Sequence, residues 1–286
     1  MRLRAAAKIN WVLEVLGRRD DGYHEMRSLM QTMGPCDALE LTVGERLNLE
    51  VEGAEQPLQD NLVLRAAALL EGGASGAHIR LTKRIPEAAG LGGGSSDAAA
   101  ALRGLNELWR LDYGDAQLVE MAVGIGSDVA FFIHGGTALA EGRGERVISL
   151  PDLSPLWLVL LVPPFRLPEK TRRMYDALRP VDFTDGHRAE ALQRRLQRGL
   201  PIVDADLHNA FERVAYEVFQ GLDTYRDALL AAGARRAHLA GSGPSLFAVG
   251  SDEGDARATH DRLRPPGGKA LLVCTLTAAE ARIIER

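Results

Sequence analysis

The sequence has little cysteine, no excess of positive charge and no long hydrophobic run. Its 286 residues include two cysteines, Cys36 and Cys274, and neither belongs to a CxxC pair. This argues against a disulfide framework or structural zinc, and favours small buried side chains in a reduced, cytoplasmic setting. The net charge is −5, whereas nucleic-acid-binding proteins are usually basic. We therefore expect no nucleic-acid partner.

The most hydrophobic run, residues 156–164, is far shorter than the roughly 20 residues that a membrane-spanning helix needs. It is typical of a buried strand. Near the start of the chain, Lys8, Asn10 and Glu14 interrupt the apolar core that a secretory signal requires. We therefore expect neither a targeting segment nor a membrane partner.

Hydrophobic residues make up 46% of the chain, which is enough for large cores. A chain of 286 residues exceeds the usual size of one domain, so two domains that share a cleft are expected. Strand-like and helix-like patterns occur in both halves, which indicates an α+β protein. A proline-marked boundary near residue 151 predicts domains at 1–150 and 151–286.

The hydrophobic patterns predict the individual elements. Alternation predicts strands over residues 5–15, 38–43, 47–51, 78–82, 137–140, 157–162 and 270–274. Helical spacing predicts helices over residues 61–70, 98–109, 115–123, 188–198, 207–219, 224–232 and 255–264. Residues 233–250 are typical of two strands joined by a tight glycine turn.

The segment PEAAGLGGGSSDAAAA, residues 86–101, lies between a predicted strand and a strongly patterned helix. Its glycines allow the backbone to approach a bulky anion. Ser95 and Ser96 stand where the helix N-cap is expected, and the free N–H groups of a helix start attract anions. A flexible linker is the alternative, but linkers are unusual between two such elements. The segment therefore predicts a phosphate-binding loop.

The spacing of this loop excludes two common phosphate-binding motifs. No lysine follows the glycines, as a Walker A loop requires. The dinucleotide fingerprint needs a glycine or alanine where this chain has Ser95 or, in the other register, Asp97. The loop belongs to a different class of phosphate site.

Three segments resemble the motifs of the GHMP kinases, which include galactokinase and homoserine, mevalonate and phosphomevalonate kinases. They are AAKINWVLEVLGRRDDGYHEM (6–26), the phosphate loop, and HLAGSGPSLFAV (238–249). With GSDVAFF (126–132), the first segment is similar to the 4-diphosphocytidyl-2-C-methyl-D-erythritol kinase family in particular. The order and spacing of the segments agree over nearly the whole chain.

This resemblance implies a two-domain GHMP kinase fold, with a ribosomal-protein-S5-like N-terminal domain and a ferredoxin-like C-terminal domain. It implies transfer of the γ-phosphoryl of ATP to the 2-hydroxyl of a cytidylated methylerythritol, in the non-mevalonate route to isopentenyl diphosphate. ATP implies Mg²⁺, whose ligands the sequence leaves open between Ser95, Ser96 and the phosphates. The ATP-binding residues implied are Pro86, Glu87, Ala88, Ala89, Gly90, Leu91, Gly92, Gly93, Gly94, Ser95 and Ser96.

The resemblance assigns the chemistry to Lys8 and Asp128. The carboxylate of Asp128 would accept the hydroxyl proton, and the ammonium of Lys8 would orient the hydroxyl, hold Asp128 ionised and neutralise the migrating phosphoryl. The residues alone leave alternatives open. An aspartate after Gly-Ser is commonly a turn or capping residue, and a lysine near an N-terminus is commonly a solvated surface charge.

Asn10, Tyr23 and His24 resemble the cytidine end of the substrate site, where a pyrimidine needs an aromatic face and edge hydrogen bonds. Thr171 and Tyr175 match the family's second aromatic segment. A tyrosine at position 175 is equally typical of helix packing, and both interpretations stay open.

Trp11, Ala130 and Pro244 depart from the family pattern, but none of these changes removes a chemical group. Three other functions stay open: another GHMP kinase, a catalytically inactive binding protein of this fold, and an RNA-associated S5-like domain. The Gly-Tyr-His segment argues against another GHMP kinase. The retained Lys8 and Asp128 argue against an inactive binding protein, and the acidic charge argues against an RNA-associated domain. The sequence does not specify an oligomeric state.

Overall fold

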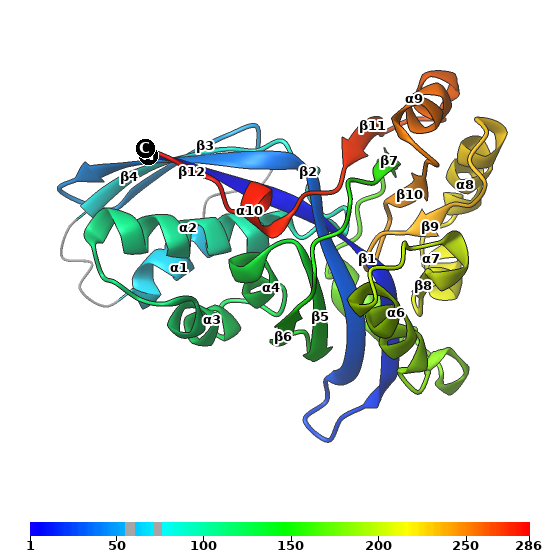
Figure 1. Cartoon of the computed structure of the whole chain (residues 1–286), viewed down its shortest axis with the longest axis horizontal. Helices are drawn as coiled ribbons and strands as arrows, with labels where there is room; N and C mark the ends of the chain where they lie inside the picture. Colours follow the sequence, from blue (N-terminus) through cyan, green and yellow to red (C-terminus); the bar gives the residue numbers. More distant parts are fainter. Residues whose placement is uncertain (55–60, 71–75) are drawn as a thin grey trace.

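The computed structural model describes residues 1–54, 61–70 and 76–286, and within them the chain forms two β-sheets (Figure 1). The larger sheet contains eight strands in the described residues, with the central order β12-β1-β2-β4-β3. Its strands are β1 (Arg2–Arg18), β2 (His24–Gly44), β3 (Asn48–Glu52), β4 (Gly76–Thr82), β5 (Thr137–Gly142), β6 (Arg146–Ser149), β8 (His208–Asn209) and β12 (Ile284–Glu285). The smaller sheet has the order β11-β7-β10-β9, with β7 (Trp157–Val162), β9 (His238–Leu239), β10 (Leu246–Val249) and β11 (Lys269–Cys274).

The long hairpin of β1 and β2 runs from the larger sheet toward the smaller one (Figure 1). Both strands are longer than the sequence predicts, because β2 pairs along its length with β1, β4 and β5 in turn. β1 contributes successively to three hydrophobic cores, through Leu3, then Ile9, then Val15. This explains why β1 is buried on both faces instead of alternating between core and solvent.

Helices cover one face of the larger sheet (Figure 1). They are α1 (Leu62–Leu69), α2 (Gly93–Trp109), α3 (Asp115–Val123) and α4 (Val129–His134). Helix α2 lies close to the strands because its inner face is small: residues 98–101 are buried alanines, and a Cβ on Gly104 would lie 2.4 Å from Leu41 Cδ1. The alanine run is therefore what lets the phosphate loop, which leads into α2, lie against β1.

The remaining helices are α5 (Lys170–Asp176), α6 (His187–Gln197), α7 (Glu212–Val218), α8 (Leu222–Ala231), α9 (Glu253–Arg262) and α10 (Ala278–Ala281), with 3₁₀ turns at Pro180–Asp182 and Asp204–Asp206. The helix predicted over residues 207–219 is wrong in its first part. Residues 208 and 209 pair with β1 instead, and the Asn209 side chain donates to the carbonyls of Leu239 and Gly241. These tertiary bonds outweigh the helical pattern.

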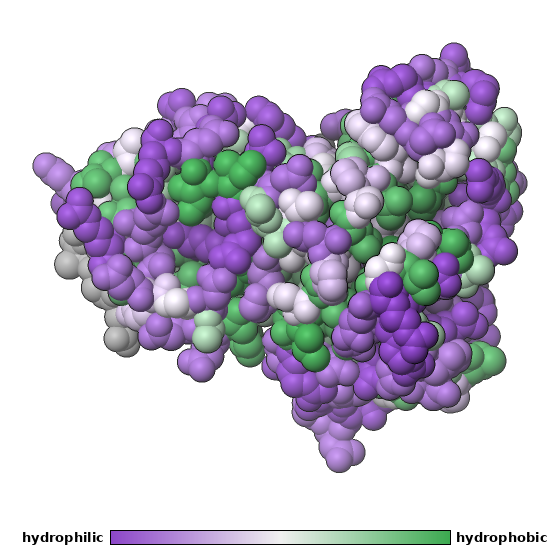
Figure 2. Space-filling view, viewed as in Figure 1, coloured by the Kyte–Doolittle hydropathy of each residue, from purple (hydrophilic) through white to green (hydrophobic). Residues whose placement is uncertain are grey.

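The two mixed sheet-and-helix units confirm the α+β fold. The division at residue 150 stays a prediction, since β8 and β12, from the later part of the chain, both pair with β1. Within the described residues, no helix combines the length and hydrophobicity needed to cross a membrane. Figure 2 shows mostly hydrophilic residues over this face, with hydrophobic side chains gathered in patches nearer its centre.

Candidate active site

A cleft of about 830 Å³ collects most of the residues that the sequence singles out. Its walls include β1, the phosphate loop, the start of α4, the start of α5 and residues of the segment 238–249, the third glycine segment. The predicted site residues that line it are Lys8, Asn10, Pro86, Glu87, Ala88, Ala89, Gly90, Leu91, Gly92, Gly93, Gly94, Ser95, Asp128, Thr171 and Tyr175. Ser96, Tyr23 and His24 do not line it.

The phosphate loop ends in a helix start that differs from the expected one. Helix α2 begins at Gly93, with Gly92 as the N-cap residue in the left-handed conformation at φ 74°. The N–H of Ser96 already bonds to the carbonyl of Gly92 at 2.9 Å. The prediction that the serines cap the helix is therefore wrong, because the glycines continue the helix backward by most of a turn. The N–H groups of the first turn before Ser96 lack intrahelical acceptors, as an anion site needs.

Gly90 and Gly92 let the loop approach other segments closely. A Cβ on Gly90, which has φ 85°, would lie 2.4 Å from the carbonyl oxygen of Ala240 and 3.0 Å from that of Gly243. A Cβ on Gly92 would lie 3.0 Å from Lys8 Cγ. The loop therefore packs directly against both the motif lysine and the third glycine segment. Of the two loop serines, Ser95 faces the cleft and Ser96 is buried.

Lys8 is buried, with 5% of its surface exposed, so it is not a solvated surface charge. Its Nζ donates to Asn10 Oδ1 at 2.9 Å, and Asn10 Nδ2 donates to Ser28 Oγ at 2.7 Å. Ser28 Oγ in turn donates to the carbonyl of Val12 at 2.8 Å. The structure thus places Asn10 beside Lys8, where this chain of bonds holds the ammonium in the cleft.

Asp128 occupies the N-cap position of α4, but its side chain makes no capping hydrogen bond. Its Oδ2 lies 3.6 Å from Lys8 Nζ, and about a third of the side chain (32%) is exposed. The carboxylate is thus free to meet a ligand in the cleft. This geometry favours the functional interpretation of Asp128 over the capping one.

Tyr175 and His24 lie face to face, with ring centroids 4.9 Å apart and planes 26° from parallel. The rings of Tyr175 and Phe211 are nearly perpendicular, at 89°, with their centroids 4.9 Å apart. Burial, followed by the charge of Asp128, raises the pKa of the Tyr175 hydroxyl to about 12. Burial, followed by the charge of Arg18, lowers the pKa of His24. Tyr175 therefore packs against neighbouring rings and also lines the cleft, and its role in binding the base stays a prediction.

Tyr23 lies outside this arrangement. It is 56% exposed in the turn between β1 and β2, and the guanidinium of Arg143 lies over its ring, 4.6 Å from the centroid. The structure does not bring Tyr23 to the cleft with Tyr175. Its role in binding the base stays a prediction.

Sequence reasoning missed two lysines that line the cleft, Lys83 and Lys170. Lys83 Nζ donates to Asp37 and, at 2.6 Å, to Asp97 at the start of α2. Burial acts to lower the pKa of Lys83, but the charges of Asp97 and Asp37 outweigh it and raise that pKa. Burial and the nearby Asp37 raise the pKa of Asp97, against the effect of Lys83. The sequence signal that could have found this cluster is a lysine just before the phosphate loop, Lys83, and an acid just after its glycines, Asp97.

Lys170 begins α5, and its Nζ donates to the carbonyl of Gly243 at 2.5 Å. Burial, with the charge of Lys8 next, lowers the pKa of Lys170 to about 8, and Asp128 opposes this shift. Nothing in the local sequence of this lysine points to the cleft, because its partners come from other segments.

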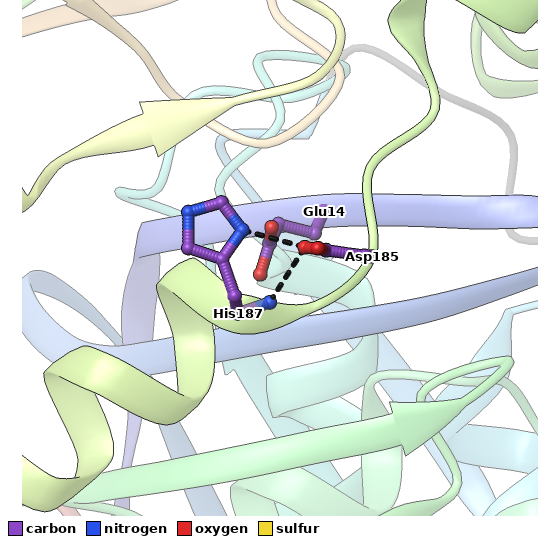
Figure 3. Close-up of side chains that lie close together, drawn as sticks. All are labelled: Glu14, Asp185 and His187. Atoms are coloured by element: carbon purple, nitrogen blue, oxygen red, sulfur yellow. Dashed lines mark hydrogen bonds and ion pairs between the residues drawn. The ribbon is translucent and has the colours of Figure 1, made fainter.

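One cluster with metal-ligand chemistry lies away from the cleft. Within residues 1–54, 61–70 and 76–286, the only such group of three consists of Glu14, Asp185 and His187 (Figure 3). Glu14 Oε2 accepts from the N–H of Ala189 at 2.9 Å, and Asp185 Oδ1 accepts from the N–H of His187 at 3.1 Å. These bonds fix the start of α6 on β1, where a buried carboxylate is stabilised by the helix N-terminus. The cluster therefore has a structural explanation.

Comparison with known proteins fits this geometry. The GHMP kinases N terminal domain model matches residues 61–136, and the GHMP kinases C terminal model matches residues 189–267. A 4-diphosphocytidyl-2-C-methyl-D-erythritol kinase of Dehalococcoides mccartyi is 42% identical over 280 residues, which cover 96% of this chain and 98% of the relative. The protein so named in Pelotomaculum thermopropionicum is 44% identical over 278 residues, or 95% and 96% of the two chains.

Solved structures agree. A 4-(cytidine 5'-diphospho)-2C-methyl-D-erythritol kinase has a TM-score of 0.81 at 36% identity, covering 96% of this chain and 99% of that one. A mevalonate kinase of L. major in complex with R-mevalonate has a TM-score of 0.68 at 16% identity, covering 98% and 97%, and so shares the fold.

The two sheets, the glycine loop and the two matched models define the class, that of the GHMP kinases, which use ATP to phosphorylate small molecules. With about 40% identity to its relatives over nearly its full length, the chain belongs to the 4-diphosphocytidyl-2-C-methyl-D-erythritol kinase family. The resemblance carried by the sequence motifs is thus confirmed.

Proposed function

We propose that this cleft transfers the γ-phosphoryl of ATP to the 2-hydroxyl of 4-diphosphocytidyl-2-C-methyl-D-erythritol. The observation that carries the proposal is the pair of Lys8 and Asp128, 3.6 Å apart in a cleft that the phosphate loop also lines. A phosphoryl-transfer site needs an anion cradle, a positive charge and a proton acceptor in one place, and these three features meet here.

The phosphates of ATP bind along the loop, against the N–H groups at the start of α2. Ser95 is the loop hydroxyl that lines the cleft, so it is the one that reaches a phosphate or the metal. Mg²⁺ favours oxygen ligands of this kind and commonly binds the nucleotide phosphates as well. When bound, it neutralises phosphate charge; the residues described below act on the acceptor and its proton.

The acceptor hydroxyl lies between Lys8 and Asp128. Asp128 accepts the proton as the hydroxyl oxygen bonds to phosphorus, and the ADP oxygen leaves with its electron pair. Lys8 is held by Asn10, so its ammonium keeps one position while charge moves through the site. A preorganised charge of this kind stabilises the transition state, because it needs no reorganisation during the reaction.

The cytidine end of the substrate binds at the α5 side of the cleft. Tyr175 offers the aromatic surface, with His24 stacked behind it, and Thr171 lies beside it in the cleft wall. Tyr23 closes on the base from the β1–β2 turn. Binding of the base there positions the distant hydroxyl, so that part of the binding energy serves the reaction.

The domains at 1–150 and 151–286, and a cytoplasmic location, belong to the same proposal. The location is supported by Cys36 and Cys274, both free thiols in the structure. Within the described part of the chain, each sheet has its own hydrophobic surroundings, which supports two domains that contribute opposite walls of the cleft.

A phosphoryl-transfer assay with ATP tests the function. Four acceptors are compared: the cytidylated methylerythritol, mevalonate, homoserine and galactose. We expect transfer to the first at a far higher kcat/KM, and phosphorus NMR of the product to place the phosphate on the 2-hydroxyl. Preference for another acceptor would replace the substrate assignment, and absence of transfer to all four would favour a binding protein.

A further inference from the structure

Lys170 is a cation in the cleft that the mechanism above does not use. It belongs to α5, on the substrate side, yet its ammonium reaches across to the third glycine segment and bonds to the carbonyl of Gly243. That carbonyl lies 3.0 Å from the position of a Cβ on Gly90, in the phosphate loop. Lys170 Nζ therefore stands where the phosphate loop, the third glycine segment and α5 meet.

The ammonium of Lys8 lies close to the same third glycine segment. A Cβ on Gly241 would lie 3.1 Å from Lys8 Nζ and 2.7 Å from the carbonyl oxygen of Gly90. The two ammoniums thus flank the contact between Gly90 and the third glycine segment. Asp128 acts on both, as the ion-pair partner of Lys8 and as a charge that stabilises the protonated form of Lys170.

Lys170 has hydrogen-bonding capacity to spare. An ammonium has three donors, and in the described chain one acceptor is recorded for it, the neutral carbonyl of Gly243. Two ammoniums and one carboxylate leave this end of the cleft with a surplus of positive charge, which a phosphoryl group would neutralise. The chain also lacks the lysine that follows the glycines in a Walker A loop.

We propose that Lys170 binds the phosphoryl group during its transfer, as a second cation beside Lys8. The inference rests on the proposed function, since it assigns a role in that reaction. Lys170 donates to a phosphoryl oxygen on the side that faces Gly243, while Lys8 serves the side that faces Asp128. As bonds to the ADP oxygen break and bonds to the acceptor form, both ammoniums stabilise the charge on the phosphoryl oxygens.

The charges around Lys170 give this role a pH signature. The charges that act on it are Lys8 from β1 and Asp128 from the start of α4, while the third glycine segment offers a carbonyl. On its own segment, Glu169 pairs with Arg172 at 3.5 Å. The pKa of Lys170 is lowered to about 8, chiefly by burial. Lys170 is thus charged below that pH and loses its charge above it. The kcat/KM of the enzyme is therefore expected to fall as the pH rises through about 8.

Three variants test the proposal by kinetics: Lys170→Met, Lys170→Arg and the control Arg173→Met. Arg173 lies exposed on the same helix and does not line the cleft, so its loss removes an equal charge from outside the site. Lys170→Met should lower kcat by roughly 10²-fold, the scale for one lost transition-state donor, with KM for ATP little changed. Lys170→Arg should restore most of the activity, and Arg173→Met should match the wild-type protein.

Two readouts separate this role from a structural one. In Lys170→Arg the fall in kcat/KM near pH 8 should disappear, because a guanidinium stays charged there. In calorimetry, Lys170→Met should bind ADP with the affinity of the wild-type protein. In the wild type, aluminium fluoride and the acceptor should make ADP bind more tightly, and Lys170→Met should lose this gain in affinity. Near-normal kcat in Lys170→Met, or the same alkaline fall in both Lys170 variants, would overturn the proposal. Absence of transfer in the wild type and in Arg173→Met alike would instead overturn the proposed function.

Discussion

Two lysines lie against neighbouring glycines of the phosphate loop, and their partners differ. Lys83 Nζ would lie 3.4 Å from a Cβ on Gly93, and Lys8 Cγ would lie 3.0 Å from a Cβ on Gly92. Lys83 is bonded to Asp37 and Asp97, whose side chains are almost completely buried. Lys8 faces Asp128 at 3.6 Å, and that carboxylate is about one-third exposed.

The difference separates a closed ion cluster from the open pair that we propose as catalytic. The cluster around Lys83 joins β2 to the start of α2, and its single ammonium already bonds to both carboxylates, so it fixes where the loop begins. The pair of Lys8 and Asp128 is looser and open to the cleft, so a hydroxyl can enter it. The proposal that Lys8 and Asp128 take part in the reaction therefore rests on the geometry of the pair, and not on the presence of a lysine and an aspartate alone.

Breaking the open pair should produce the largest change in activity. Asp128→Asn should lower kcat by roughly 10² to 10⁴, the usual range for a lost general base. Stability should change little, because the carboxylate caps nothing and is partly solvated. Steady-state kinetics and thermal melting measure the two effects. Near-normal turnover would reduce Asp128 to a turn residue.

Breaking the closed cluster around Lys83 should lower stability more than activity. Asp37→Ala should lower the free energy of unfolding by about 1–3 kcal/mol for each buried donor that loses its acceptor, and Lys83 loses one of its two carboxylate acceptors while it keeps Asp97. The N–H groups of Arg84 and Ile85 also lose their acceptor. Urea denaturation checks this prediction. If stability is unchanged and only kcat falls, the distinction between the two clusters is wrong.

The two tyrosines proposed to bind the cytidine, Tyr175 in the cleft and Tyr23 outside it, offer a finer comparison. Tyr175→Ala should raise KM for the cytidylated substrate by an amount equivalent to about 1–3 kcal/mol, the scale of base–aromatic stacking, with KM for ATP unchanged. Tyr23→Ala should have the smaller effect, since Tyr23 is exposed and must move to reach the base. Phenylalanine at either position is the control for the ring face.

Two results would contradict the expected order of the two tyrosines. If Tyr23→Phe is as damaging as Tyr23→Ala, the hydroxyl rather than the ring face matters, and stacking by Tyr23 is excluded. If Tyr23→Ala raises KM more than Tyr175→Ala does, the base binds chiefly to the β1–β2 turn.

Much of the fold follows from local patterns, and the exceptions have specific causes. Helix α3 matches its predicted range of 115–123, because propensity and periodicity agree there. The predicted helix at 207–219 begins only at Glu212, because Asn209 bonds to the third glycine segment. The serine N-cap was misplaced because glycine propensity argues against a helix, whereas in the structure Gly93 and Gly94 already belong to α2 and Gly92 is its N-cap residue.

The sequence by itself determined the family and predicted the phosphate loop, Lys8 and Asp128, because each is carried by a short run of residues with fixed spacing. Only the tertiary structure decided which charges meet. Lys170 and Gly243 are 73 residues apart, and Lys83 and Asp37 are 46 apart. No periodicity links such positions. Lys83 and Asp37 meet because β2 pairs with β4, and Lys170 meets Gly243 because the start of α5 lies against the segment of residues 238–249.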